Sequence, residues 1–208
     1  MFIVDSYALA IALCVVTMLC WGSWGNTQKL AGKTWRYELF YWDYVIGILL
    51  FSLVMGFTLG SMGEQGRSFV PDLMQVTSSG MLSAIIGGIV FNLSNILLSA
   101  STSLAGLSVA FPLGVGLALV IGVFNTYFFV GGNQGNPTLI FNGLASAKQN
   151  SGAGQSSSAK KGIILAILAG ILMSTFYTFV ASAMDIENFE NPAAGKATPY
   201  TAFFLFAI

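Results

Sequence analysis

The stretch CWGSWGNTQKLAGKTWRYELFYWDY, at residues 20–44, is a polar and aromatic island between two long apolar runs. It holds all four tryptophans of the chain. Its charged residues are Lys29, Lys33, Arg36, Glu38 and Asp43. Loops that carry lysine and arginine are retained on the cytoplasmic side of a membrane. We therefore interpret this stretch as a cytoplasmic hairpin loop, together with the ends of the two helices that it joins.

The composition of the whole chain is typical of a membrane protein. Of 208 residues, 55% are hydrophobic and 8% are charged, whereas soluble domains carry about 25% charged residues. The net charge of zero argues against a nucleic-acid partner. The absence of histidine excludes a histidine-based catalytic triad or zinc site. We expect a lipid bilayer as the surrounding medium, with no catalytic residue, metal or cofactor.

Five apolar segments are long enough to cross a membrane, since a crossing needs about 20 residues. They are residues 7–25, 39–60, 80–100, 107–130 and 162–183. We predict a short turn at residues 101–106 between the third and fourth segments. A mildly apolar piece at residues 138–145 has only about half the required length. A further apolar run begins at residue 198.

These segments suggest a division of the chain into two unequal parts. Residues 1–147 form a first transmembrane half with four full spans and a stunted fifth. Residues 148–161 form a cytoplasmic linker rich in Gly, Ser and Ala, and residues 162–208 begin a second half. We expect the chain to be an incomplete transporter that lacks part of a fifth helix near Phe141 and Asn142. We also expect it to lack everything that follows Ile208.

The predicted fold is an all-α membrane protein, a helical bundle of inverted repeats that is incomplete here. Transporters are often built from such repeats. A weak repeat is visible in the aromatic residues that open two of the apolar runs. They are Tyr37, Phe40 and Tyr41 in one run, and Tyr200, Phe203 and Phe204 at the same spacing in the other.

The lysine and arginine residues also predict the orientation in the membrane. The basic loop at residues 29–36 places the first hairpin inside and the N-terminus outside. The lysines of the 148–161 linker lie outside if residues 138–145 do not cross the membrane, and inside if they do. We expect a multi-pass protein of the cell membrane.

Polar residues within the apolar segments are the candidate functional residues. Asn92, Asn95 and Ser99 share one helix face by their spacing. This face either holds helices together by hydrogen bonds or lines a cavity. Asp43, about one turn into the second segment, is either a proton-coupling group or an interfacial acid. Pro112 interrupts the fourth segment and is a hinge candidate.

Two stripes of small residues repeat every four positions. They are Gly114, Ala118, Gly122 and Thr126 in one segment, and Ala166, Gly170, Ser174, Thr178 and Ser182 in another. Small residues let helix backbones approach closely. We therefore predict that both stripes are packing faces, and we consider a homodimer through them.

Several of these motifs resemble a known family. They are the W-G-S-W motif from Trp21 to Trp24, WRYELFYWDY at residues 35–44, FNLSN at residues 91–95, KKG at residues 160–162 and PYTAFF at residues 199–204. Together they resemble ureide permease-type members of the drug/metabolite transporter superfamily. The glucose/ribose uptake and rhamnose–proton symport branches are similar in layout. The resemblance implies a bundle of about ten helices in two inverted halves.

We expect a secondary transporter, or permease, for a small neutral polar metabolite, possible substrates being a ureide, a purine breakdown product or a related heterocycle. Trp21, Trp24, Asn92 and Asn95 are the expected substrate contacts, since indole faces stack on flat rings and amides match ring carbonyl and N–H groups. Asp43 is the expected proton carrier. Uptake of a glucose-, ribose- or rhamnose-type sugar is the alternative within transport. A non-transporting membrane subunit or inactive fragment is the alternative of another class.

Overall fold

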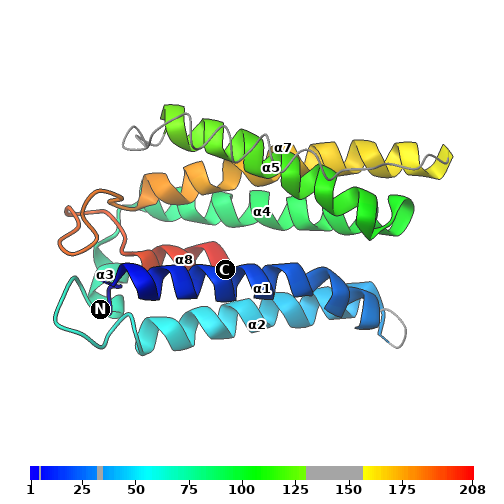
Figure 1. Cartoon of the computed structure of the whole chain (residues 1–208). Coiled ribbons are helices and arrows are strands. Elements are labelled where there is room, and N and C mark those ends of the chain that lie inside the picture. Colours follow the sequence, from blue (N-terminus) through cyan, green and yellow to red (C-terminus); the bar gives the residue numbers. More distant parts are fainter. Residues whose placement is uncertain (5, 32–34, 130–156) are drawn as a thin grey trace. The chain divides into compact units, whose positions relative to one another are not determined.

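The computed structural model describes residues 1–4, 6–31, 35–129 and 157–208, and for residues 37, 38, 126–129 and 157–159 it describes the backbone alone. The regular elements of these ranges are helices (Figure 1). They are α1 (Tyr7–Ala31), α2 (Tyr37–Phe57), α3 (Phe69–Gln75), α4 (Ser78–Ala105), α5 (Leu107–Phe129), α7 (Ser157–Ala183) and α8 (Pro199–Ala207). The predicted all-α fold is confirmed. The inverted-repeat arrangement stays a prediction.

Five of the described helices are long and apolar enough to cross a membrane. These spans are Tyr7–Ala31, Leu39–Phe57, Ser78–Ala105, Leu107–Asn125 and Lys160–Ala183. Large apolar side chains on them face outward, and Met18 and Leu19 on α1 are 72% and 68% exposed. Such surfaces suit lipid better than water. The structure therefore confirms that the five predicted segments form helices long and apolar enough to cross a membrane.

The predicted turn at residues 101–106 is wrong, because α4 continues to Ala105 and Gly106 alone makes the turn into α5. The φ angle of Gly106 is 83°, a conformation that glycine adopts without steric cost. The hydroxyls of Ser101 and Thr102, which lie within the predicted turn, donate to the main-chain oxygens of Gly162 and Leu98 at 2.7 and 2.8 Å. In an apolar setting such hydroxyls bond to helix carbonyls instead of favouring a turn.

Two other boundaries also differ from the sequence-based expectation. α7 begins at Ser157, so the last five residues of the predicted 148–161 linker are helical. The polar loop after α2 contains the short helix α3, which begins after Ser68 and buries Phe69 and Asp72. The predicted stunted fifth helix at residues 138–145 lies outside the described residues.

The chain forms two compact units, and the first combines residues 1–76 with residues 185–208. In it, α8 packs antiparallel to α2. The rings of Phe51 and Phe203 lie 6.3 Å apart, and Gly60 lies against the side chain of Tyr200. Phe69 of α3, which is 2% exposed, contacts the ring of Phe204 edge-on at 5.4 Å. The aromatic residues that open α8 are therefore core contacts of this unit.

The second unit, residues 77–184, is built from α4, α5 and α7. α4 and α7 run antiparallel, since Ser83 pairs with Ser182 and Ser101 pairs with Gly162. α5 runs parallel to α7, and the two predicted stripes of small residues meet in register. Gly114 lies against Ala166 and Gly170, while Gly122 lies beside Ser174. The packing interpretation is therefore confirmed for Gly114, Ala118, Gly122, Ala166, Gly170 and Ser174.

This helix arrangement has two consequences. The faces on which we based the homodimer prediction cover each other within one chain. Because α5 and α7 are parallel, α7 begins at the end of the unit opposite to the end at which α5 finishes. Lys160 and Lys161 therefore lie at the same end as the Gly106 turn.

Candidate functional site

The tryptophans predicted to contact substrate lie in the first unit on α1. Trp21 is 44% exposed. Trp24, one turn further along, is half-buried, and its ring lies 5.8 Å from that of Tyr44 on α2. Gly25, beside Trp24, is buried, so α1 approaches α2 with Trp24 at the contact. Trp21 thus offers an open indole surface and Trp24 a partly covered one.

Asp43, the predicted proton carrier, precedes Tyr44 on α2 and its side chain is exposed. Its position is about one turn from the start of the span Leu39–Phe57. An ionisable side chain inside a membrane span is costly, so such residues usually serve in ion or substrate pathways. Its position thus fits both a proton carrier and an interfacial acid, and both interpretations stay predictions.

The predicted amide face lies in the second unit on α4. Asn95 and Ser99 are each 4% exposed, and Asn92 is half-buried. The Asn95 side chain makes no hydrogen bond to another described residue. A buried amide in an apolar helix needs a hydrogen-bond partner. Asn95 therefore has the property expected of a group that receives a ligand.

The hydrogen bonds that hold the helices of this unit together come from serines that sequence reasoning did not select. Ser94 donates to the main-chain oxygen of Ala169 at 2.9 Å, and Ser83 donates to that of Phe179 at 2.8 Å. Serines are common in any sequence, so only the position of each relative to α7 identifies them. These serines therefore make interhelical hydrogen bonds of the kind that we predicted as one alternative for Asn92 and Asn95.

Pro112, the hinge candidate, lies within α5, which is one continuous helix through this position. Its side chain is exposed. Proline removes one intrahelical hydrogen bond, and the helix tolerates this loss within its second turn. The hinge role stays a prediction.

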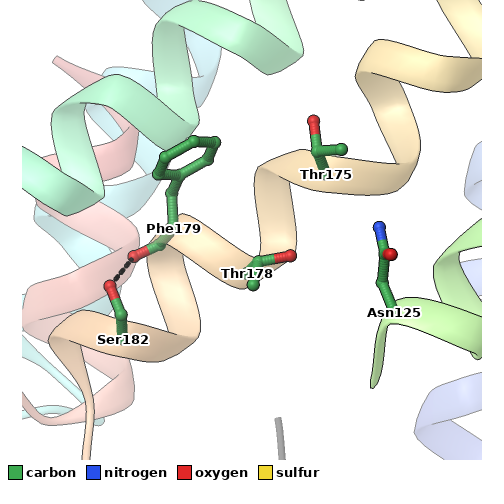
Figure 2. Close-up of a pocket in the computed structure, with 5 residues that line it drawn as sticks. All are labelled: Asn125, Thr175, Thr178, Phe179 and Ser182. Atoms are coloured by element: carbon green, nitrogen blue, oxygen red, sulfur yellow. Dashed lines mark hydrogen bonds between the residues drawn. The ribbon is translucent and has the colours of Figure 1, made fainter. Parts of the chain in front are cut away.

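A pocket of about 430 Å³ lies between α5 and α7 in the second unit. Its walls come from Asn125 of α5 and from Thr175, Thr178, Phe179 and Ser182 of α7. Figure 2 shows Asn125 opposite Thr175 and Thr178, with the Thr178 hydroxyl turned toward Asn125. Neither Asn125 nor Thr178 was among the predicted substrate contacts. Thr178 belongs to the polar C-terminal part of one small-residue stripe, and Asn125 is a neutral amide within an apolar segment, which are the sequence signals that could have indicated them.

The structure brings Trp24 together with Tyr44, the neighbour of Asp43, in one unit. It brings Asn92 and Asn95 together on α4 in the other. The predicted contacts of the tryptophans and the asparagines with a substrate stay predictions. Within the described ranges, no three Cys, Asp or Glu side chains gather as metal ligands would.

Comparison with known proteins identifies relatives of this sequence. The sequence profile of the ureide permease family matches residues 40–148, more than half of the chain. Ureide permease 1 and ureide permease 2 of Arabidopsis thaliana are 30% and 31% identical over 129 and 132 residues, which is 62% of this chain and 33% of each relative. Ureide permease 5 of the same plant is 27% identical over 149 residues, 69% of this chain and 36% of the relative.

The chain spans about a third of the length of these curated relatives. No solved structure matches it. The match to the family profile covers α4, α5 and most of α2, which are three of the five apolar helices. The chain is an integral membrane protein that belongs to the ureide permease family.

Proposed function

We propose that the chain acts in a secondary active transporter that moves a small neutral polar metabolite across the membrane by alternating access. The substrate class is a ureide, a purine breakdown product or a related heterocycle. Two relatives carry the name ureide permease 1 and ureide permease 2, which supports this class. The same resemblance supports membership in the drug/metabolite transporter superfamily. It also supports the proposal that the chain is a transporter and not an enzyme.

The observation that carries the proposal is the buried Asn95. No Asp, Glu, Lys or Arg occurs from residue 73 to residue 147, so α4 and α5 offer only neutral polar groups to a ligand. An amide of this kind can donate to a ring carbonyl and accept from a ring N–H. A neutral substrate therefore fits this face better than an anion or a cation.

Trp21 and Trp24 are the proposed stacking contacts. Indole faces bind flat rings through a large apolar surface, and the ring N–H can donate a hydrogen bond. Asn92 and Asn95 are the proposed contacts to the polar edge of the substrate.

Asp43 is the proposed proton carrier, since it is the acid that lies within the span Leu39–Phe57. An inward proton gradient should drive uptake of allantoin into vesicles that contain the wild-type chain. Asp43→Asn should abolish the stimulation by the gradient and leave exchange of allantoin at equal pH. Glu64→Gln, which alters an exposed acid outside the spans, is the matched control. Equal stimulation in wild type and Asp43→Asn would remove this role.

The proposed orientation places the N-terminus outside and the basic residues inside, in the cell membrane. Arg36, which is exposed before α2, and the exposed Lys160 and Lys161 support it. Because α5 and α7 are parallel, the start of α7 lies at the same end of the second unit as the Gly106 turn. Alternation of the spans from an external N-terminus places that end inside, in agreement with the positive-inside rule.

The substrate class is tested by a ligand panel in detergent. Allantoin and uracil should raise the thermal unfolding midpoint, because a ligand that binds the folded state stabilises it. Glucose, ribose and rhamnose should leave the midpoint unchanged. The opposite pattern would favour the sugar uptake alternative. Stabilisation by allantoin without uptake by the 208-residue chain would favour a non-transporting subunit.

A further inference from the structure

The pocket between α5 and α7 contains polar groups of two kinds. The hydroxyls of the first kind already make hydrogen bonds within the protein. Thr175 donates to the main-chain oxygen of Leu172 at 2.9 Å. Ser182 donates to that of Phe179 at 2.8 Å, and its Oγ lies 2.6 Å from Oγ of Ser83. These groups shape the wall, and each already has a partner.

Groups of the second kind are available. Asn125 donates through Nδ2 to the main-chain oxygen of Ser174 at 3.3 Å. This bond fixes the amide orientation, because a carbonyl oxygen cannot donate to another carbonyl. The Oδ1 atom of Asn125 is therefore left as an acceptor. The hydroxyl of Thr178 makes no hydrogen bond with another described residue, so it can both donate and accept.

The pocket thus presents one fixed acceptor, Asn125 Oδ1, opposite one free hydroxyl, Thr178 Oγ1 (Figure 2). Both side chains are half-buried, so a ligand can reach them while water is partly excluded. A group that places an N–H beside a carbonyl matches this pair, since its N–H donates to Asn125 and its carbonyl accepts from Thr178. Amides in rings, imides and ureas carry such an edge.

The geometry points to this pocket as a second binding site for the substrate, one that holds the amide or urea edge of an uncharged molecule. This assignment rests on the proposed transport function. None of the five lining residues is charged, and their remaining surface is largely methyl and ring carbon. A ring with polar groups on one edge fits such walls, whereas a sugar would leave hydroxyls around its ring without partners. Pockets of this kind, mostly apolar with a few placed polar groups, are typical of small-molecule sites.

The pocket lies toward the ends at which α5 and α7 finish, since Ser182 is the residue before the last of α7. That end is opposite to Lys160 and Lys161. In the proposed orientation it is the external end. The pocket is therefore placed to receive substrate from outside before it moves to the face of Asn95.

Binding to the full chain in detergent tests the assignment directly. The probes are uracil, allantoin and an N,N′-dimethylated uracil, which has the same ring without an N–H. Thr178→Val removes the free hydroxyl and keeps the shape of the side chain. Asn125→Leu removes the acceptor and leaves the main-chain oxygen of Ser174 within its helix. We expect each variant to raise the dissociation constants of uracil and allantoin about tenfold, as the loss of one hydrogen bond predicts.

Tyr177→Phe is the matched control, because it removes a hydroxyl from the neighbouring position of α7 that does not line the pocket. We expect it to bind both probes as the wild type does. The dimethylated uracil has no N–H to donate to Asn125 Oδ1, so it should bind weakly to the wild type and equally weakly to Asn125→Leu. If Asn125→Leu does not fold, the dissociation constants of Thr178→Val and Tyr177→Phe are sufficient to test the assignment.

Three results separate this inference from the proposed function. Wild-type binding that Thr178→Val and Asn125→Leu leave unchanged overturns the assignment, even if vesicles take up the probes. Absence of uracil and allantoin binding by the wild type overturns it as well. Binding that both variants weaken, in a chain that gives no uptake into vesicles, supports the pocket and contradicts the transport function.

Discussion

Arg67 donates a 2.8 Å hydrogen bond through Nε to Oδ1 of Asp72, and no part of the Asp72 side chain is exposed. The other carboxylate oxygen accepts the N–H of Thr198, the N-cap residue of α8, at 2.7 Å. Arg67 also donates to the main-chain oxygens of Pro192 and Lys196, both at 2.6 Å. One ion pair therefore fastens the loop before α3 to the segment that leads into α8.

Arg67→Met should destabilise the chain by about 3 kcal/mol, because removal of one partner leaves a buried carboxylate without its cation. This value is the lower end of the usual range, since the Arg67 side chain is 28% exposed. Thermal unfolding in detergent measures the change as a lower midpoint. Glu64→Gln, an exposed acid of the same loop, should leave the midpoint unchanged. An equal midpoint for Arg67→Met and wild type would show that the pair contributes nothing to stability.

Gly170→Ala should destabilise the chain by about 1–3 kcal/mol, the usual cost of overpacking. A Cβ atom at position 170 would lie 2.6 Å from the main-chain oxygen of Gly114 and 3.2 Å from Cβ of Leu117. Backbone atoms cannot turn aside as a side chain can, so α5 and α7 must separate. Gly116→Ala is the control, since a Cβ there meets nothing within 4 Å. Titration with denaturing detergent should unfold Gly170→Ala first, and equal unfolding of the two variants would contradict close packing of the helices.

The membrane spans could be predicted from the sequence because a long apolar run has few alternatives in a chain with so little charge. The packing stripes could be predicted too, since Gly114 and Gly170 repeat with small residues every four positions. The turn was predicted too long, at residues 101–106, because serine and threonine favour turns in water, while here the hydroxyls of Ser101 and Thr102 bond to helix carbonyls.

Much less of the pocket could be predicted. Thr178 and Asn125 are ordinary neutral residues whose value depends on which partners their neighbours have already taken. The hydroxyls of Thr175 and Ser182 bond to main-chain oxygens of their own helix, and no sequence pattern separates them from the hydroxyl of Thr178. The network of Asp72 joins residues far apart in the sequence, so no local pattern indicates it.

The antiparallel packing of α4 and α7 predicts which residues share a face of the membrane. Single cysteines at Ser103 and Lys160, both exposed, should react with a membrane-impermeant thiol reagent from the same side. A cysteine at Ser79, exposed near the start of α4, should react from the other side. The background is Cys14→Ala with Cys20→Ala, because both native cysteines are exposed. In the proposed orientation Lys160 and Ser103 face the cytoplasm, so they should react in inside-out vesicles and Ser79 in right-side-out ones. Labelling of the Ser103 and Lys160 positions from opposite sides would contradict the parallel arrangement of α5 and α7, because α7 would then begin where α5 ends.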